Sequence, residues 1–244
     1  MTADKPDATS TPARDSNDGA AVESEPSSIR LIATLAIAGL ISGVAIIGIY
    51  EATLDTITAN KARELKEAVF KVLPGVAKMQ KMIFKDDKLI ATNTQEKDEL
   101  PIYGGYDNEG QFVGYAIPGE GAGFQDTIKI LYGYKADTRK VVGMEVLDSK
   151  ETPGLGDKIY KDLSFVANFD DLTVEPEIVA VKKGKKSAPN EIDAITGATI
   201  SSKAIVKIIN QTNQIWLSNL PEPGQEPELM IIEQTNEVET GRGE

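Results

Sequence analysis

The longest apolar run of the chain lies near its N-terminus. Residues 31–50 (LIATLAIAGLISGVAIIGIY) contain no charged side chain, and Arg30 and Glu51 flank them. A helix of that length spans about 30 Å, the thickness of the hydrocarbon core of a bilayer. A buried core helix or a cleaved signal peptide is the alternative, but a signal peptide has a basic leader and about 7–15 apolar residues, whereas this leader is long and acidic. We predict a single transmembrane helix over residues 29–50.

Beyond this run, helical and β-type periodicities follow one another. Apolar residues at helical spacing in residues 56–75, ended by Pro74 and Gly75, predict a stalk helix. Four β-rich runs predict strands, at residues 111–117, 126–135, 140–148 and 172–183. Residues 157–165 and the amphipathic run 201–220 predict two further helices. This order indicates an α+β fold, in which one transmembrane helix precedes a domain with a mostly antiparallel sheet and flanking helices.

The two ends of the chain have the composition of solvated tails. Residues 1–28 are rich in Ser, Thr, Pro, Asp and Ala and have few large apolar side chains, so they cannot bury enough surface to offset their ordering entropy. Residues 221–244 carry seven glutamates and one arginine. We predict disordered tails over both stretches, a stalk helix over residues 51–75 and a folded domain over residues 76–220.

Composition narrows the chemistry that the chain can perform alone. The formal net charge of −12 and the pI near 4.7 argue against a nucleic-acid partner, whose phosphates would be repelled. The chain has no cysteine and no histidine, which removes thiolate and imidazole metal ligands, the cysteine nucleophile and the usual general base. We therefore expect no metal site and a borrowed cofactor as the source of any chemistry.

Two glycine-rich stretches are expected to form loops. Residues 118–126 (PGEGAGFQD) precede a predicted strand, and residues 150–159 (KETPGLGDKI) follow one and lead into a helix. Glycines at such positions let the backbone approach a flat ring or a phosphate, because no Cβ intervenes. Tight turns without a ligand remain the alternative.

Hydroxyl side chains gather in residues 193–202 (DAITGATISS), just before the C-terminal helical run. A helix that begins near Thr199 would direct its first N–H groups toward this stretch, and its dipole would favour an anion there. Asp193 could help to bind a metal or orient a hydroxyl. The alternative is a plain helix cap, with Thr196 or Ser201 as the capping residue.

The same stretch resembles a known motif. Asp193, Thr196, Gly197, Ala198 and Thr199 match the Asp-x-x-Thr-Gly-Ala-Thr flavinylation motif of covalent FMN-binding domains. The resemblance implies that Thr199 carries FMN through a phosphoester bond, attached by a flavin transferase that uses FAD. It also implies that the other four residues contribute to the cofactor site.

The stretch ETPGLGDKI resembles a second signature of this family. It adds six expected cofactor-binding residues: Glu151, Thr152, Pro153, Gly154, Leu155 and Gly156. Together with the single N-terminal anchor, the two motifs are similar to those of the G subunits of Rnf electron-transport complexes, whose close relatives are the C subunits of Na⁺-pumping NADH:quinone oxidoreductases. Two departures stand out: Ser149 and Lys150 occupy positions where the family often has histidine, and residues 118–126 match its glycine-rich flavin loop only loosely.

The resemblance implies a membrane-anchored flavoprotein that relays electrons within an ion-translocating ferredoxin:NAD⁺ oxidoreductase, with no catalytic residue beyond the flavin. Its partners would be the other membrane, iron–sulfur and flavin subunits, the flavin transferase during maturation, and membrane lipid. The N-terminus would be cytoplasmic and the FMN domain extracytoplasmic at the inner membrane, although the charges around the helix do not decide this. A flavoprotein of the Na⁺-pumping NADH:quinone oxidoreductase type and a non-redox anchored scaffold remain the alternatives.

Overall fold

The computed structural model describes residues 28–86, 88–92 and 101–230. The predicted tail over residues 1–28, except Ser28, and residues 231–244 of the C-terminal tail lie outside the described residues. The chain divides into two units, Met1–Asp55 and Thr56–Glu244, which are described separately below.

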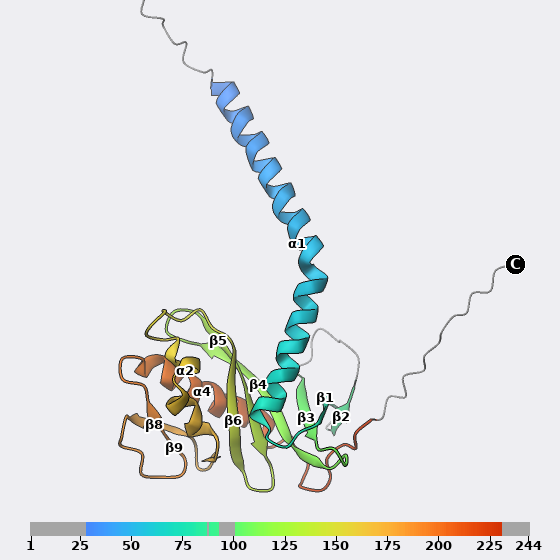
Figure 1. Cartoon of the computed structure of the whole chain (residues 1–244), viewed down its shortest axis with the longest axis vertical. Coiled ribbons are helices and arrows are strands. Elements are labelled where there is room, and N and C mark those ends of the chain that lie inside the picture. The colour runs from blue at the N-terminus through green and yellow to red at the C-terminus, as the bar shows by residue number, and fades with distance from the viewer. Residues whose placement is uncertain (1–27, 87, 93–100, 231–244) are drawn as a thin grey trace, which may run out of the picture. The chain divides into compact units, whose positions relative to one another are not determined.

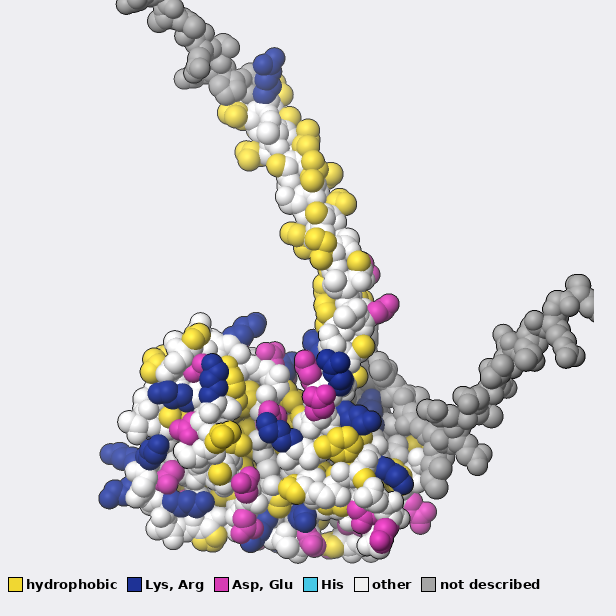
Figure 2. Space-filling model, in the orientation of Figure 1, with side chains coloured by type: hydrophobic (Ala, Val, Ile, Leu, Met, Phe, Trp, Pro, Cys, Tyr) yellow, Lys and Arg dark blue, Asp and Glu magenta, His cyan; other side chains and the backbone are white. Residues whose placement is uncertain are grey.

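Helix α1 (Ser28–Val72) is continuous, so no break separates the predicted transmembrane helix from the predicted stalk. Its N-terminal part makes up the described residues of the first unit. By length and composition α1 can cross a membrane, and its most apolar window is not buried within the protein. Apolar side chains project around this part of the helix (Figure 2). Within residues 28–86, 88–92 and 101–230, one helix is thus suited to the predicted anchor.

The second unit is built on a seven-stranded antiparallel sheet with the order β2-β1-β3-β4-β5-β6-β7 (Figure 1). Its strands are β1 (Lys78–Lys85), β2 (Lys88–Ala91), β3 (Ile102–Tyr106), β4 (Phe112–Ala122), β5 (Thr127–Lys135), β6 (Lys140–Asp148) and β7 (Leu172–Thr173). A separate parallel pair joins β8 (Val179–Lys182) to β9 (Glu191–Ala194). The predicted α+β fold with a mostly antiparallel sheet is confirmed.

The described helices other than α1 all follow β6 in sequence. Three short ones come first: α2 (Lys158–Lys161), α3 (Leu163–Val166) and the 3₁₀ helix η1 (Ala167–Phe169). The single helix predicted over residues 157–165 is therefore two, since the chain leaves helical geometry at Asp162, whose side chain accepts a hydrogen bond from the Ser164 N–H at the start of α3. The long helix α4 (Thr199–Trp216) corresponds to the predicted C-terminal helix.

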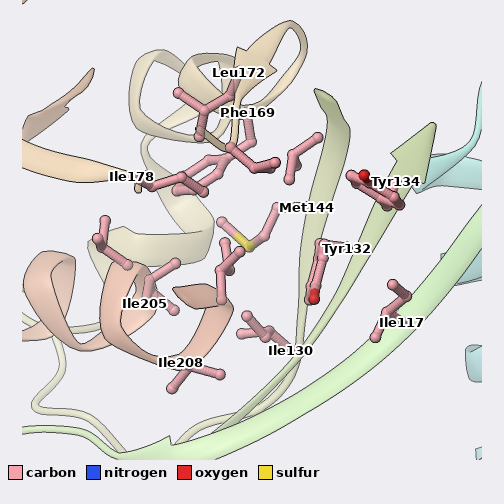
Figure 3. Close-up of a cluster of buried hydrophobic side chains, with 14 of the residues drawn as sticks. Ile117, Ile130, Tyr132, Tyr134, Met144, Phe169, Leu172, Ile178, Ile205 and Ile208 are labelled. Atoms are coloured by element: carbon pink, nitrogen blue, oxygen red, sulfur yellow. The ribbon is translucent and has the colours of Figure 1, made fainter. Parts of the chain in front are cut away.

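The sheet buries both of its faces. Side chains of a strand point alternately to opposite sides, so Tyr115 and Ile117 join the larger core cluster, while Ala116 joins the smaller one. The larger cluster includes Ile205 and Ile208 of α4 (Figure 3). The smaller cluster contains four residues from the end of α1 and the turn after it: Ala68, Val69, Val72 and Leu73. The sheet therefore lies between α4 and the last turns of α1.

Two predicted stretches differ from the structure. Residues 118–122, expected in a loop, extend β4 and pair with β5. The glycines there admit α4, since a Cβ at Gly119 would lie 2.7 Å from the Thr212 hydroxyl oxygen and one at Gly121 2.8 Å from Ile208 Cγ1. The strand expected over residues 172–183 is divided between β7 and β8, because Pro176 has no N–H to donate to a ladder.

The segment after α4 contacts the domain. The Tyr106 hydroxyl donates a hydrogen bond to the Pro227 carbonyl, and the Met230 N–H donates one to Gln80 Oε1 at 3.1 Å. Leu229 packs against the larger core cluster. Residues 221–230 of the predicted acidic tail are thus held by hydrogen bonds and apolar contact that its glutamate-rich composition did not indicate.

Candidate functional site

Three segments that are distant in sequence form one pocket of about 320 Å³. The turn between β4 and β5 contributes one residue, the loop after β6 contributes three, and the start of α4 contributes five. The lining residues are Phe124, Thr152, Leu155, Gly156, Gly197, Ala198, Thr199, Ile200 and Ser201. The two stretches that resemble family motifs, residues 151–159 and 193–199, therefore both contribute to a single site.

The first two segments present apolar side chains to solvent at the pocket. In the β4–β5 turn, the Gly123 N–H donates to the Asp126 carbonyl at 2.8 Å, and the Phe124 side chain between them is 64% exposed. In the loop after β6, the Leu155 N–H donates to the Thr152 carbonyl at 3.1 Å, and the Leu155 side chain is 51% exposed. Such exposed apolar side chains beside a pocket suit a flat, largely apolar ligand.

The start of α4 presents backbone N–H groups to the same pocket. Ala198 is the N-cap residue, and its methyl side chain has no polar atom with which to cap the helix. The Ser202 N–H donates to the Ala198 carbonyl at 2.9 Å. This is the first bond of the helix, so the helix itself supplies no acceptor for the N–H groups of Thr199, Ile200 and Ser201. The alternative interpretation required Thr196 or Ser201 as the N-cap, and neither residue holds that position. The helix dipole at this end favours an anion.

The three hydroxyls in the first turn of α4 differ in availability. The Ser202 hydroxyl is buried, donates to the Ala198 carbonyl at 2.9 Å and accepts from the Ile195 N–H at 3.1 Å. The Ser201 hydroxyl is buried and donates to Glu151 Oε2. Thr199 is exposed, and its hydroxyl lies 3.4 Å from the Ile195 carbonyl, longer than an ordinary O–H···O bond. Thr199 is therefore the hydroxyl of this turn that is open to reaction.

A buried carboxylate lies behind the pocket. Glu151 is 5% exposed, and its Oε1 accepts hydrogen bonds from the Phe124 N–H at 2.8 Å and the Gln125 N–H at 2.9 Å. Burial alone would raise its pKa, but the hydrogen bonds from Gln125, Ser201 and Phe124 outweigh burial, so the pKa of Glu151 lies below its ordinary value. Glu151 is thus ionised at neutral pH.

The structure divides the residues expected at the cofactor site into two groups. Those that line the pocket are Thr152, Leu155, Gly156, Gly197, Ala198 and Thr199. Those that do not are Glu151, Pro153, Gly154, Asp193 and Thr196. Of these, Pro153, Gly154 and Thr196 are exposed turn residues. Asp193 lies in β9, and its Oδ1 accepts from the N–H groups of Lys185 at 3.2 Å and Lys186 at 3.3 Å.

Sequence reasoning missed two apolar residues of the pocket, Phe124 and Ile200. A large apolar side chain in a glycine-rich turn was the available signal for Phe124. Among the described residues, no group of three or more acidic side chains is placed to hold a metal ion. A larger groove of about 740 Å³ runs between the end of α1 and β6, but it contains none of the expected site residues.

Comparison with known proteins first defines the class. The family model of the FMN-binding domain matches residues 123–214, which include all three segments of the pocket. The crystal structure of NqrC from Shewanella oneidensis has the same fold, with a TM-score of 0.52 and 16% identity over 62% of this chain and 91% of that one. The chain therefore contains an FMN-binding domain.

Two curated relatives specify the family. The G subunit of the Na(+)-translocating ferredoxin:NAD(+) oxidoreductase complex of Acetobacterium woodii is 34% identical over 67% of this chain and 79% of its own length. The G subunit of the ion-translocating oxidoreductase complex of Methanosarcina acetivorans is 29% identical over 74% of this chain and 90% of its own. The chain belongs to the family of G subunits of ion-translocating oxidoreductase complexes, which confirms the resemblance drawn from its motifs.

Proposed function

We propose that this protein is a membrane-anchored electron-transfer subunit of an ion-translocating ferredoxin:NAD⁺ oxidoreductase complex and carries FMN covalently on Thr199. The observation that carries the proposal is the state of the hydroxyls at the start of α4. Thr199 and Ser201 both line the pocket, but the hydroxyls of Ser201 and Ser202 are buried and hydrogen-bonded, whereas Thr199 is exposed. The family of the chain and the names of its relatives support the redox role.

The attachment would be a transfer from FAD catalysed by a separate flavin transferase. Thr199 Oγ1 would form a bond to the flavin-side phosphorus while the pyrophosphate P–O bond of FAD breaks and AMP leaves. The hydroxyl proton would be released, and no oxidation or reduction would take place. The phosphodiester product keeps one negative charge, which the N–H groups and dipole of α4 would stabilise.

The pocket residues would hold the attached group in place. Phe124, Leu155 and Ile200 offer exposed apolar surface for a ring system. Gly197 leaves room for its close approach, since a Cβ there would meet only Leu155 Cδ2, at 4.0 Å. When bound, FMN supplies the electron-transfer chemistry, so we assign no catalytic acid or base to the chain.

Helix α1 would anchor the protein in the inner membrane, with residues 1–28 cytoplasmic and the FMN-binding domain extracytoplasmic. The length and apolar composition of α1 support the anchor, and Arg30 at its N-terminal end favours this orientation. The other subunits of the complex and membrane lipid would be the partners. Protease added to spheroplasts should digest the domain after Tyr50 and spare the N-terminal tail, and the reverse pattern would contradict the orientation.

The central test is the site of attachment. The full chain is expressed with and without a flavin transferase, denatured and separated on a gel, where a covalent flavin fluoresces under ultraviolet light. We expect a fluorescent band only with the transferase, and a peptide containing Thr199 heavier by FMN less water. Thr199→Ala should abolish the band, and Thr199→Ser should retain part of it. A dark wild-type band in the presence of active transferase, the behaviour of a scaffold protein, or flavin on Thr196 or Ser201 refutes the proposal.

A further inference from the structure

We propose that Glu151 is the positioning residue of the pocket, because its carboxylate holds the three pocket segments together and does not itself bind the ligand. The identity of the ligand in this inference rests on the proposed function. The hydrogen bonds of Glu151 that support the inference lie within the protein and do not depend on the ligand. It assigns to Glu151 a role different from the cofactor contact expected from its motif.

The carboxylate bonds to both of the other segments. Oε1 accepts from the N–H groups of Phe124 and Gln125, which lie 27 and 26 residues away in sequence, and Oε2 accepts from the Ser201 hydroxyl, 50 residues away. Glu151 itself begins the third segment, the loop after β6. The Thr152 hydroxyl adds a bond of 2.9 Å to Gln125 Oε1. One side chain therefore connects the β4–β5 turn, the loop after β6 and the first turn of α4.

The surrounding backbone leaves room for this carboxylate. A Cβ at Gly123 would lie 2.5 Å from Glu151 Oε1, and a Cβ at Gly156 would lie 2.7 Å from Oε2. Real Cβ atoms essentially never come within 3.0 Å of such neighbours. The carboxylate is therefore among the neighbours that favour glycine at these two positions. The others include the Asp126 carbonyl oxygen, 2.8 Å from a Cβ at Gly123, and Glu151 Cβ, 2.7 Å from a Cβ at Gly156.

The charge of Glu151 is stabilised by N–H and O–H groups. Among the described residues no lysine or arginine forms an ion pair with it, and the neighbouring Lys150 pairs with Asp126 at 3.1 Å. A buried carboxylate without a cation is costly unless several donors point at it. Bonds from such donors to a charged acceptor are stronger than neutral ones, so the same carboxylate that needs three segments in place also holds them there.

The arrangement also leaves the reactive hydroxyl free. Glu151 accepts a hydrogen bond from the hydroxyl of Ser201, which is two residues after Thr199 in sequence and lines the same pocket. Glu151 itself is absent from the pocket lining. It acts through its hydrogen bonds to Phe124 and Ser201. Its replacement should therefore affect the positions of the pocket segments more than the folding of the domain.

The test compares two replacements with a matched control in the full chain. Glu151→Ala removes both acceptors. Glu151→Gln keeps an oxygen that can accept from the two backbone amides. Its side-chain NH₂ can donate a hydrogen bond to the Ser201 hydroxyl oxygen. Glu191→Ala is the control, because Glu191 also accepts from two backbone N–H groups and a serine hydroxyl, those of Ser187 and Ala188, in a loop that does not line the pocket.

Amide hydrogen exchange in the flavin-free chain is the first measurement. The Phe124 and Gln125 amides should exchange at least about tenfold faster in Glu151→Ala, because bonds to a charged acceptor are lost, and should speed up less in Glu151→Gln, whose neutral side-chain oxygen still accepts. The amides of β3 report whether the sheet is intact. Glu191→Ala should speed exchange at Ser187 and Ala188 and leave Phe124 and Gln125 protected.

The second measurement uses the flavinylated chain. Glu151→Ala should alter the visible absorption spectrum and midpoint potential of the flavin, Glu151→Gln should lie between Glu151→Ala and wild type in both, and Glu191→Ala should match wild type. Unchanged exchange at Phe124 and Gln125 in Glu151→Ala overturns the inference, as does faster exchange with an unaltered flavin spectrum and potential. A wild-type chain that takes up no flavin would refute the proposed function, while the exchange result would still decide the role of Glu151.

Discussion

The close contact between β5 and the end of α1 makes Gly133→Ala a severe change. A Cβ at Gly133 would lie 2.0 Å from the Val72 carbonyl oxygen and 2.8 Å from its carbonyl carbon. Gly143, which pairs with Gly133 across the sheet, would place a Cβ 2.7 Å from the same oxygen. These neighbours are backbone atoms, which cannot rotate away as a side chain can. The last turn of α1 must therefore move off the sheet.

The size of this displacement sets the expected cost. To reach the 3.0 Å below which real Cβ contacts essentially never occur, the helix end must shift by about 1 Å. That shift loosens Val69, Val72 and Leu73, which are fully buried in the smaller core cluster. Overpacking a core costs about 1–3 kcal/mol, and with backbone opposed to the new methyl group we expect about 3 kcal/mol. For a domain of this size the melting temperature should fall by about 6–12 °C.

Trp216 provides the assay. It is the single tryptophan of the chain, is buried and ends α4, so its fluorescence during heating of the full chain in detergent reports the second unit. Gly104→Ala is the matched control, since its Cβ would lie 2.3 Å from Met82 Cε, the end of a flexible side chain that can move. We expect this control to cost about 1 kcal/mol or less. A Gly133→Ala melting temperature within error of wild type, or equal to that of Gly104→Ala, would refute the reasoning.

Two further predictions use the same fluorescence assay. Ser202→Ala removes a buried hydroxyl and leaves the Ile195 N–H without its acceptor, so it should destabilise by about 1–3 kcal/mol; a loss smaller than that of an exposed Lys203→Ala replacement would contradict this. The pKa of Glu151 is lowered in the folded protein, so its contribution is present above the ordinary value of 4.5 and is lost as the pH falls through the lowered pKa. The stability difference between wild type and Glu151→Gln should therefore shrink as the pH falls below about 4.5, and a difference that grows in acid would show that the sign is wrong.

Local patterns predicted the elements whose signals are contained within one stretch. The apolar run of residues 31–50 lies in a helix, and α4 begins at Thr199, within the range that its hydroxyl-rich start indicated. The β4–β5–β6 meander also follows its periodicity. Residues 118–122 were misplaced because their glycines are typical of a loop, although here they admit α4. That reason lies in a helix some 90 residues later in the sequence, which no local window contains.

The pocket shows the same limit more sharply. The resemblance identified the motif that begins at Asp193 and ends at Thr199, but these two residues belong to different secondary-structure elements. Asp193 lies at the end of β9 and holds the loop of Lys185 and Lys186, whereas Thr199 lies at the start of α4 and faces the pocket. Between them the chain reverses through Gly197, whose φ of 85° favours glycine. The spacing of the motif therefore corresponds to a strand end, a turn and a helix start, and this geometry points Thr199 at a pocket whose other walls are held by Glu151.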